Sequence, residues 1–180
     1  MSVQSERAAA VAATVARVRA IEATQGTGRP ALEAIAAEVT ALASNTALFP
    51  PAHFPVAGGK GTIYRLSEDA DHRFALYASA GVPGKAQPPH DHTTWAAISG
   101  VYGEERNVFW RRTDDGGTAG RATLEETGGK TVRRGNAVSF GPDEIHSIHV
   151  EGKVPSLHLH MYGMSLERLR EVRAKKVGMV

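Results

Sequence analysis

Hydrophobic positions in the first 45 residues repeat with the spacing of a helix. One stripe consists of Val11, Val15, Val18 and Ile21, which fall at i, i+4, i+7 and i+10. A second stripe, after Pro30, consists of Leu32, Ile35, Val39 and Leu42. Alanine is frequent in both segments and favours helix, and proline is tolerated in the first helical turn. Residues 1–45 are therefore predicted to form a helical hairpin that packs on a larger body.

From residue 62 onward the period changes, and short apolar or alternating runs replace the helical stripes. The eight runs are 62–66, 73–78, 94–99, 107–111, 122–125, 137–140, 145–150 and 156–162. Turn-forming sequences separate them, namely residues 81–84, 114–117, 128–129 and 141–142. Short strands at this spacing predict an antiparallel sandwich or barrel. We expect one domain over residues 1–180, with N-terminal helices at 1–45, a connector at 46–61, a barrel at 62–163 and a short closing helix at 165–177.

Composition places the chain among ordinary globular proteins, with 42% apolar and 22% charged residues. There is no cysteine, which excludes a disulfide, a thiolate metal site and a cysteine nucleophile. The formal net charge is only +2, and basic residues cluster only in pairs, so we expect no nucleic-acid partner. We also expect no membrane partner, because no stretch approaches 18 uncharged apolar residues. The apolar run at 8–16 lies between Glu6 and Arg17 and lacks the pattern of a secretory leader, so a cytoplasmic location is expected.

The eight histidines include the sharpest chemical signal in the chain, the motif His90-Asp91-His92. In a strand, residues i and i+2 project to the same face, so two imidazoles can converge on one metal ion. The preceding Pro88-Pro89 would hold the approach to this motif rigid.

A second motif follows the first, in which Gly135, a short apolar run and Pro142 lead to His146. A His-x-His pair and this later glycine–strand–proline–histidine layout resemble the two metal motifs of cupin barrels. The resemblance implies a mainly β fold, the double-stranded β-helix or jelly-roll-like barrel of cupins. It makes His90, His92 and His146 the expected metal ligands.

One departure from that pattern concerns the glutamate which cupins usually supply four or five residues after the second histidine. Ala96 and Ala97 stand at those positions, so three neutral imidazoles would hold the ion. Three open positions would let two substrates bind one iron together. This pattern, over roughly residues 60–165, resembles the cysteine dioxygenase-like thiol dioxygenases, which include the mercaptopropionate and mercaptosuccinate enzymes. The resemblance implies Fe(II) as the cofactor.

The same resemblance assigns roles to further residues. The family carries a Ser-x-His-x-Tyr strand, and here Ser156-Leu-His158-Leu-His160-Met-Tyr162 allows two registers. The preferred register makes His160 and Tyr162 catalytic, with His158 in place of the serine; the other matches Ser156 and His158. In either register these side chains point to one face of the strand. Arg65, 25 residues before His90, and Arg168, six after Tyr162, are the candidate carboxylate-binding residues.

These features predict a non-haem iron thiol dioxygenase that converts a small thiol carboxylate, cysteine or a mercapto-acid, and O2 to the sulfinic acid. Two alternatives stay open: a metal-dependent cupin isomerase or decarboxylase, and a ligand-binding cupin that is not an enzyme. A monomer or a homodimer is expected.

Overall fold

Two antiparallel helices form the N-terminal part of the computed structural model, which describes residues 2–118 and 121–176. They are α1 (Val3–Gln25) and α2 (Arg29–Ser44), joined through Gly26, whose φ of 71° suits a residue without a Cβ. Ser2 caps α1 by accepting a hydrogen bond from the amide of Ser5 at 3.2 Å, and Pro30 lies in the first turn of α2. Two short 3₁₀ turns, Thr46–Leu48 and Pro51–His53, lead from α2 toward the sheets.

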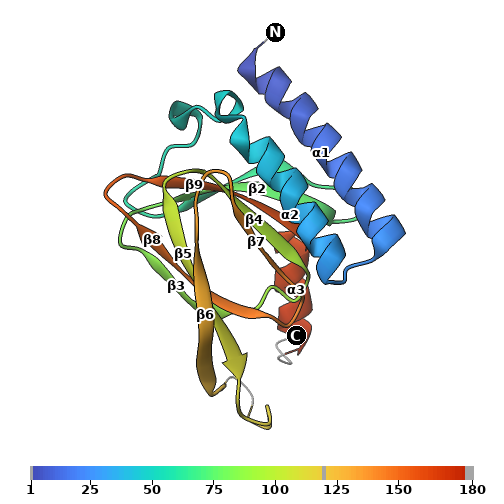
Figure 1. The fold of residues 1–180 in the computed structure, drawn as a ribbon, viewed down its shortest axis with the longest axis vertical. Helices are drawn as coiled ribbons and strands as arrows, with labels where there is room; N and C mark the ends of the chain where they lie inside the picture. The colour runs from blue at the N-terminus through green and yellow to red at the C-terminus, as the bar shows by residue number, and fades with distance from the viewer. Residues whose placement is uncertain (1, 119–120, 177–180) are drawn as a thin grey trace.

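Nine strands follow the helices and form two antiparallel sheets (Figure 1). In chain order they are β1 (Thr62–Ser67), β2 (Arg73–Gly81), β3 (Ala86–His90), β4 (Ala96–Tyr102), β5 (Glu104–Arg112), β6 (Leu124–Val132), β7 (Ala137–Phe140), β8 (Ile145–Glu151) and β9 (Ser156–Met164). One sheet has the order β1-β2-β9-β4-β7 and the other β3-β8-β5-β6. Without the edge strand β1, this is the strand order of an eight-stranded jelly roll made of two Greek keys, the architecture of cupin barrels. The predicted fold class, a mainly β double-stranded β-helix with N-terminal helices and a short C-terminal helix, is confirmed.

Two hydrophobic cores lie on opposite faces of the five-stranded sheet. The outer core joins α1 and α2 to that sheet and includes Val18, Ile35 and Trp95. The inner core lies between the two sheets and includes Tyr77, Phe140 and Tyr162. Strand β9 serves both cores, because its odd-numbered residues face the helices and its even-numbered residues face the barrel interior.

The observed strands depart from the prediction most clearly in three places. Residues 86–90 were not predicted to be a strand, yet they form β3, an edge strand that tolerates Pro88 and Pro89. Strand β4 begins at Ala96, two residues later than predicted. Gly128-Gly129, predicted as a turn, lies inside β6: a Cβ on Gly129 would stand 2.6 Å from the carbonyl oxygen of Asn107. Gly129 therefore marks a close approach of β5 and β6, and Gly128, with a φ of 145°, lies next to a bulge.

The third helix, α3 (Leu166–Lys176), follows β9 and lies beside one end of the barrel (Figure 1). Its predicted last residue, 177, is outside the described residues. Leu169 of α3 is buried, and Tyr77 accepts a hydrogen bond from the amide of Leu166 at 3.1 Å. None of the helices in the described part of the chain combines the length and apolar character needed to cross a bilayer.

Candidate metal centre

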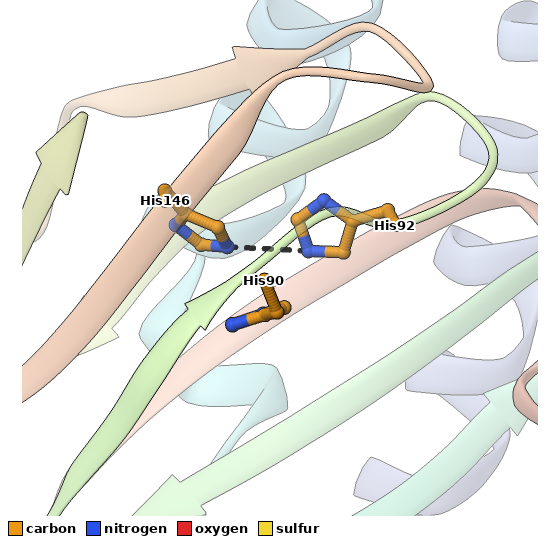
Figure 2. Close-up of side chains that lie close together, drawn as sticks. All are labelled: His90, His92 and His146. Atoms are coloured by element: carbon orange, nitrogen blue, oxygen red, sulfur yellow. Dashed lines mark hydrogen bonds between the residues drawn. The ribbon is translucent and has the colours of Figure 1, made fainter. Parts of the chain in front are cut away.

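Three histidine rings converge at the barrel end that α3 borders (Figure 2). His90 ends β3, His92 lies in the bend after it, and His146 belongs to β8. His90 and His146 are direct partners in the β3–β8 register. One ring nitrogen from each histidine lies within 4.8 Å of the others, and His92 Nε2 is 3.2 Å from His146 Nε2. The convergence was predicted from alternation within a strand, but only His90 of this pair lies in a strand, and His92 lies in the loop between β3 and β4.

Hydrogen bonds on the far side of two of these rings fix which nitrogen is free. His146 Nδ1 donates to Asn107 Oδ1 at 2.8 Å, and His90 Nδ1 donates to the carbonyl oxygen of Pro88, also at 2.8 Å. A carbonyl oxygen can only accept, so both Nδ1 atoms carry the proton and both Nε2 atoms present a lone pair. The amide of Asn107 is oriented by its own bond from Nδ2 to the carbonyl oxygen of Glu105 at 3.3 Å.

Burial keeps the three rings neutral. It is the largest cause that lowers the pKa of each ring, to about 3 for His92 and about 2 for His146. Neutral imidazoles can act as metal ligands at neutral pH, which imidazolium cations cannot. Two nitrogens that bind one ion at about 2.1 Å lie roughly 3.0–3.4 Å apart at bond angles near 90–110°. The observed 3.2 Å between His92 and His146 fits such a shared ion.

No carboxylate belongs to the histidine cluster in the part of the chain that the structure describes. The neighbouring Asp91 points elsewhere: its Oδ1 accepts from Thr93 Oγ1 at 3.0 Å and lies 3.4 Å from Arg173. Ala96 and Ala97 are fully buried in the core and bear no ligand atom. The structure thus brings together the three neutral donors that the sequence predicted, without an acidic fourth.

A cavity of about 220 Å³ opens beside this cluster. Its walls combine apolar side chains such as Ile148 and Leu166 with the polar pair His160 and Tyr162. His160 Nδ1 lies 3.0 Å from the Tyr162 hydroxyl, which fits the first of the two predicted registers. Burial is the main cause that lowers the pKa of His160 to about 4 and raises that of Tyr162, so both groups are neutral near pH 7.

His158 takes a different position from the one its assigned role requires. It is fully buried, its Nε2 donates to the carbonyl oxygen of Val132 at 3.1 Å, and its Nδ1 lies 3.2 Å from Glu105 Oε1. It does not line the cavity beside the metal cluster. Ser156 also faces inward, and its hydroxyl donates to Glu105 at 3.2 Å.

The two predicted carboxylate-binding arginines are not among the residues that line this cavity. Arg65 pairs with Glu68 at 3.0 Å and Arg168 with Glu171 at 2.7 Å, each partner three residues further along the chain. Two other arginines of α3, Arg170 and Arg173, line the cavity instead.

Sequence reasoning also missed Glu105 and Asn107, both inward-facing residues of β5. The signal that could have found them is a pair of polar residues spaced i, i+2 in a strand whose other face is exposed. Arg173 was missed as well. It donates to Thr93 Oγ1 at 3.2 Å and to the backbone carbonyl of Asp91, so it holds the segment between two of the histidines.

Comparisons with known proteins give distant similarities only. No family model matches the chain, and no curated protein does. Solved structures that resemble it include a cupin 2 conserved barrel domain protein from Leptotrichia buccalis (16% identity, 64% of this chain and 47% of that chain, TM-score 0.47). A second is an RmlC-like cupin family protein with a double-stranded β-helix fold from Methanocaldococcus jannaschii (13% identity, 65% of this chain and 92% of that chain, TM-score 0.45). A third is an oxalate oxidase in complex with the substrate analogue glycolate (16% identity, 60% of this chain and 53% of that chain, TM-score 0.45). The present chain therefore spans about half the length of that oxalate oxidase.

At these identities the fold assignment depends on the strand order. Together with the histidine cluster, that order defines a cupin-type barrel with a candidate metal centre at one end. The comparisons do not assign the chain to a particular family within this fold.

Proposed function

We propose that this protein is a non-haem iron thiol dioxygenase, in which His90, His92 and His146 hold Fe(II). The observation that carries the proposal is a cluster of three neutral imidazoles without a carboxylate, beside a hydrogen-bonded hydroxyl–imidazole pair. Ferrous iron, when bound, would favour the thiolate form of the substrate and supply the redox chemistry with O2 that side chains lack. In the overall reaction a thiol and O2 give a sulfinate and a proton, with both oxygen atoms on sulfur.

Tyr162 and His160 are the groups that handle the proton. Because burial raises the pKa of Tyr162, its phenol stays protonated and can donate a hydrogen bond toward the cavity. His160 Nδ1 then contacts the phenolic oxygen, and its Nε2 has no hydrogen-bond partner in the described structure. The pair can therefore hold one proton at the phenolic oxygen without a net charge, and His160 Nε2 can accept a proton when the phenol gives one up.

Arg170 is the proposed group for the substrate's carboxylate. Its exposed side chain lines the cavity, and its guanidinium has no ion pair or hydrogen bond with the described residues. A free guanidinium matches a carboxylate with two parallel hydrogen bonds. Arg173 is already engaged with the segment between the histidines, so its task is to position that segment.

The apolar wall limits the access of water to the histidine cluster. Phe140 packs its ring against His146, with centroids 4.2 Å apart, and against His92 at 5.6 Å. Ile148, Leu166 and Leu169 continue the wall. A dry wall strengthens the hydrogen bonds and charge contacts made inside the cavity.

Oxygen uptake by iron-loaded protein, with cysteine, 3-mercaptopropionate and mercaptosuccinate, tests the proposal. We expect uptake with at least one thiol and a product heavier by two oxygen atoms. Tyr162→Phe is expected to lower kcat by about 10²-fold, with little change in KM, because a positioned proton donor contributes at least that much. Arg170→Gln is expected to raise KM, whereas Arg168→Gln, outside the cavity, serves as the matched control. Protein whose iron content is verified and which consumes no O2 with any of these thiols would refute the proposal.

A further inference from the structure

A second lobe of about 350 Å³ adjoins the cavity at the metal cluster. The two lobes share five lining residues, Ile63, Ser79, Gln87, Ile148 and His160. Ile63 is 54% exposed, one of the few large hydrophobic side chains in the described structure that faces solvent. An exposed isoleucine where two lobes meet offers an apolar surface to a ligand that occupies both.

Glu105 lines the second lobe, and its side chain is 3% exposed. Oε1 accepts from Ser156 and lies beside His158, but Oε2 has no hydrogen-bond partner among the described residues. Burial is the largest single influence and raises the pKa of this carboxyl, but His158, His160 and Ser156 together outweigh burial, and the pKa lies below its ordinary value. An ionised carboxylate only accepts hydrogen bonds, and a buried oxygen without one is costly.

His158 cannot supply the missing donor. Its Nε2 is committed to the carbonyl oxygen of Val132, and its Nδ1 lies beside Oε1 rather than Oε2. His160, which faces both lobes, also has an unpartnered nitrogen, Nε2. Two buried polar atoms without partners on the wall of one cavity indicate a ligand that brings its own polar group.

The β5–β8 register gives the distance between this carboxylate and the histidine cluster. Glu105 pairs with Val150 and Phe109 pairs with His146, so Glu105 and the histidine cluster are separated by four residues along the strands. At about 3.4 Å per residue this is roughly 13–14 Å. A three-carbon thiol acid bound at the histidines therefore fills only the first lobe.

We propose that the second lobe is a binding subsite for the tail of an elongated ligand, whose hydrogen-bond donor, an ammonium or a hydroxyl, is accepted by Glu105 Oε2. That the other end of this ligand is a thiol at the histidine cluster rests on the proposed function. Lys60 and Lys85 line the outer part of the lobe and are exposed, so they oppose the approach of a bare cation. For this reason the test includes both a charged and a neutral donor.

The probes are alkanethiols of two to eight carbons that end in an ammonium, a hydroxyl or a methyl group. Calorimetric titrations use protein loaded with zinc, which is redox-inert, with the metal-free protein titrated in parallel. We expect affinity to peak at a chain several carbons longer than cysteamine, and one of the donor-terminated series to bind at least tenfold tighter than the methyl series at that length.

Two variants locate the effect. Glu105→Gln keeps the shape but removes the charge, and is expected to abolish most of the preference for the ammonium. Ala86→Phe narrows the second lobe and leaves the Glu105 carboxylate in place, and is expected to shorten the longest tolerated tail in all three series. Glu104→Gln, an exposed neighbour on the other face of β5, should change nothing. If Glu105→Gln does not fold, Ala86→Phe still tests the lobe.

The outcomes separate this inference from the proposed function. Equal affinity for the three chain ends at every length, or no tolerance for tails longer than cysteamine, would overturn the subsite. A tail preference that Ala86→Phe leaves unchanged would also overturn it. A preference that depends on Glu105, in a protein that oxidises no thiol when loaded with iron, would support the subsite and refute the dioxygenase.

Discussion

Replacing Asn107 by alanine tests the metal centre through a residue that binds no metal itself. Asn107 is fully buried, and its Oδ1 accepts the bond from His146 Nδ1 at 2.8 Å that leaves Nε2 free. Loss of such an outer partner weakens metal affinity by about 10–100-fold, or roughly 1.4–2.7 kcal/mol. We expect Asn107→Ala to fall in this range, and Asn107→Asp, which keeps an acceptor, to stay within about threefold of the wild type.

Thermal unfolding gives a second measure of the same effect. Zinc at one hundred times the wild-type Kd stabilises the protein by about 2.7 kcal/mol, and by about 0.9 kcal/mol after a 30-fold loss of affinity. For a chain of this length, 1 kcal/mol shifts Tm by about 2–4 °C. Zinc should therefore raise Tm by about 5–11 °C in the wild type and by about 2–4 °C in Asn107→Ala.

Competition with a chelating dye measures the zinc affinities directly. The control is Ser147→Ala, because Ser147 neighbours His146 on β8 but its hydroxyl contacts Trp110 at 2.9 Å, away from the cluster. An Asn107→Ala protein that binds zinc as tightly as the wild type would refute the assignment of His146 as a ligand oriented by Asn107.

Three further predictions concern packing and charge. Trp95 Nε1 donates to Glu22 at 2.9 Å, which ties the residue just before β4 to α1. Trp95→Phe should lower the free energy of unfolding in urea by about 2 kcal/mol, with metal affinity unchanged. A Cβ at Gly163 would stand 2.5 Å from that same indole nitrogen, so Gly163→Ala should cost about 1–3 kcal/mol in the same assay. Glu105 has a folded-state pKa below its ordinary value, so its stabilising contribution is full above pH 4.5 and lost as pH falls through the lower folded value. The Tm difference between wild type and Glu105→Gln should therefore shrink below pH 4.5.

Each of these predictions has a contrary result. Wild-type stability for Trp95→Phe or Gly163→Ala would show that the contact between the indole and its neighbours is loose. Gly28→Ala is the control for the glycine substitution, because Gly28 has an ordinary φ of −70° and its nearest neighbouring atom is 3.9 Å away. A Tm difference that grows toward pH 3 would mean that Glu105 is protonated in the folded protein.

The helical hairpin, most strands and the three converging histidines could be predicted from the sequence, because each depends on local periodicity or on short motifs. The His90–His92 spacing and the glycine–proline approach to His146 are local signals of this kind. The pairing of His160 with Tyr162 follows from alternation within one strand. These features require no knowledge of how distant segments meet.

The remaining site residues depend on contacts between distant segments. Glu105 becomes significant only because β9 places Ser156 and His158 opposite it, 51 and 53 residues later. Arg170 and Arg173 reach the cavity, and Arg168 does not, because rotation along α3 selects which side chains face the barrel. Gly128-Gly129 resembles a turn in sequence, and the approach of Asn107, which explains Gly129 inside a strand, is a contact with a distant segment.

Strand β9 assigns two separate tasks to alternate residues. Leu157, Leu159 and Met161 hold the helical layer in place, while His158, His160 and Tyr162 face the barrel interior. Substitutions at the odd-numbered positions of β9 should therefore change mainly the stability of the protein. Substitutions at the even-numbered positions should change mainly the properties of the cavity and the histidine cluster. A shift of β9 by a single residue would invert both assignments at once, burying imidazoles under the helices and turning leucines toward the histidine cluster. The register of this one strand thus ties the integrity of the helical layer to the assembly of the candidate site.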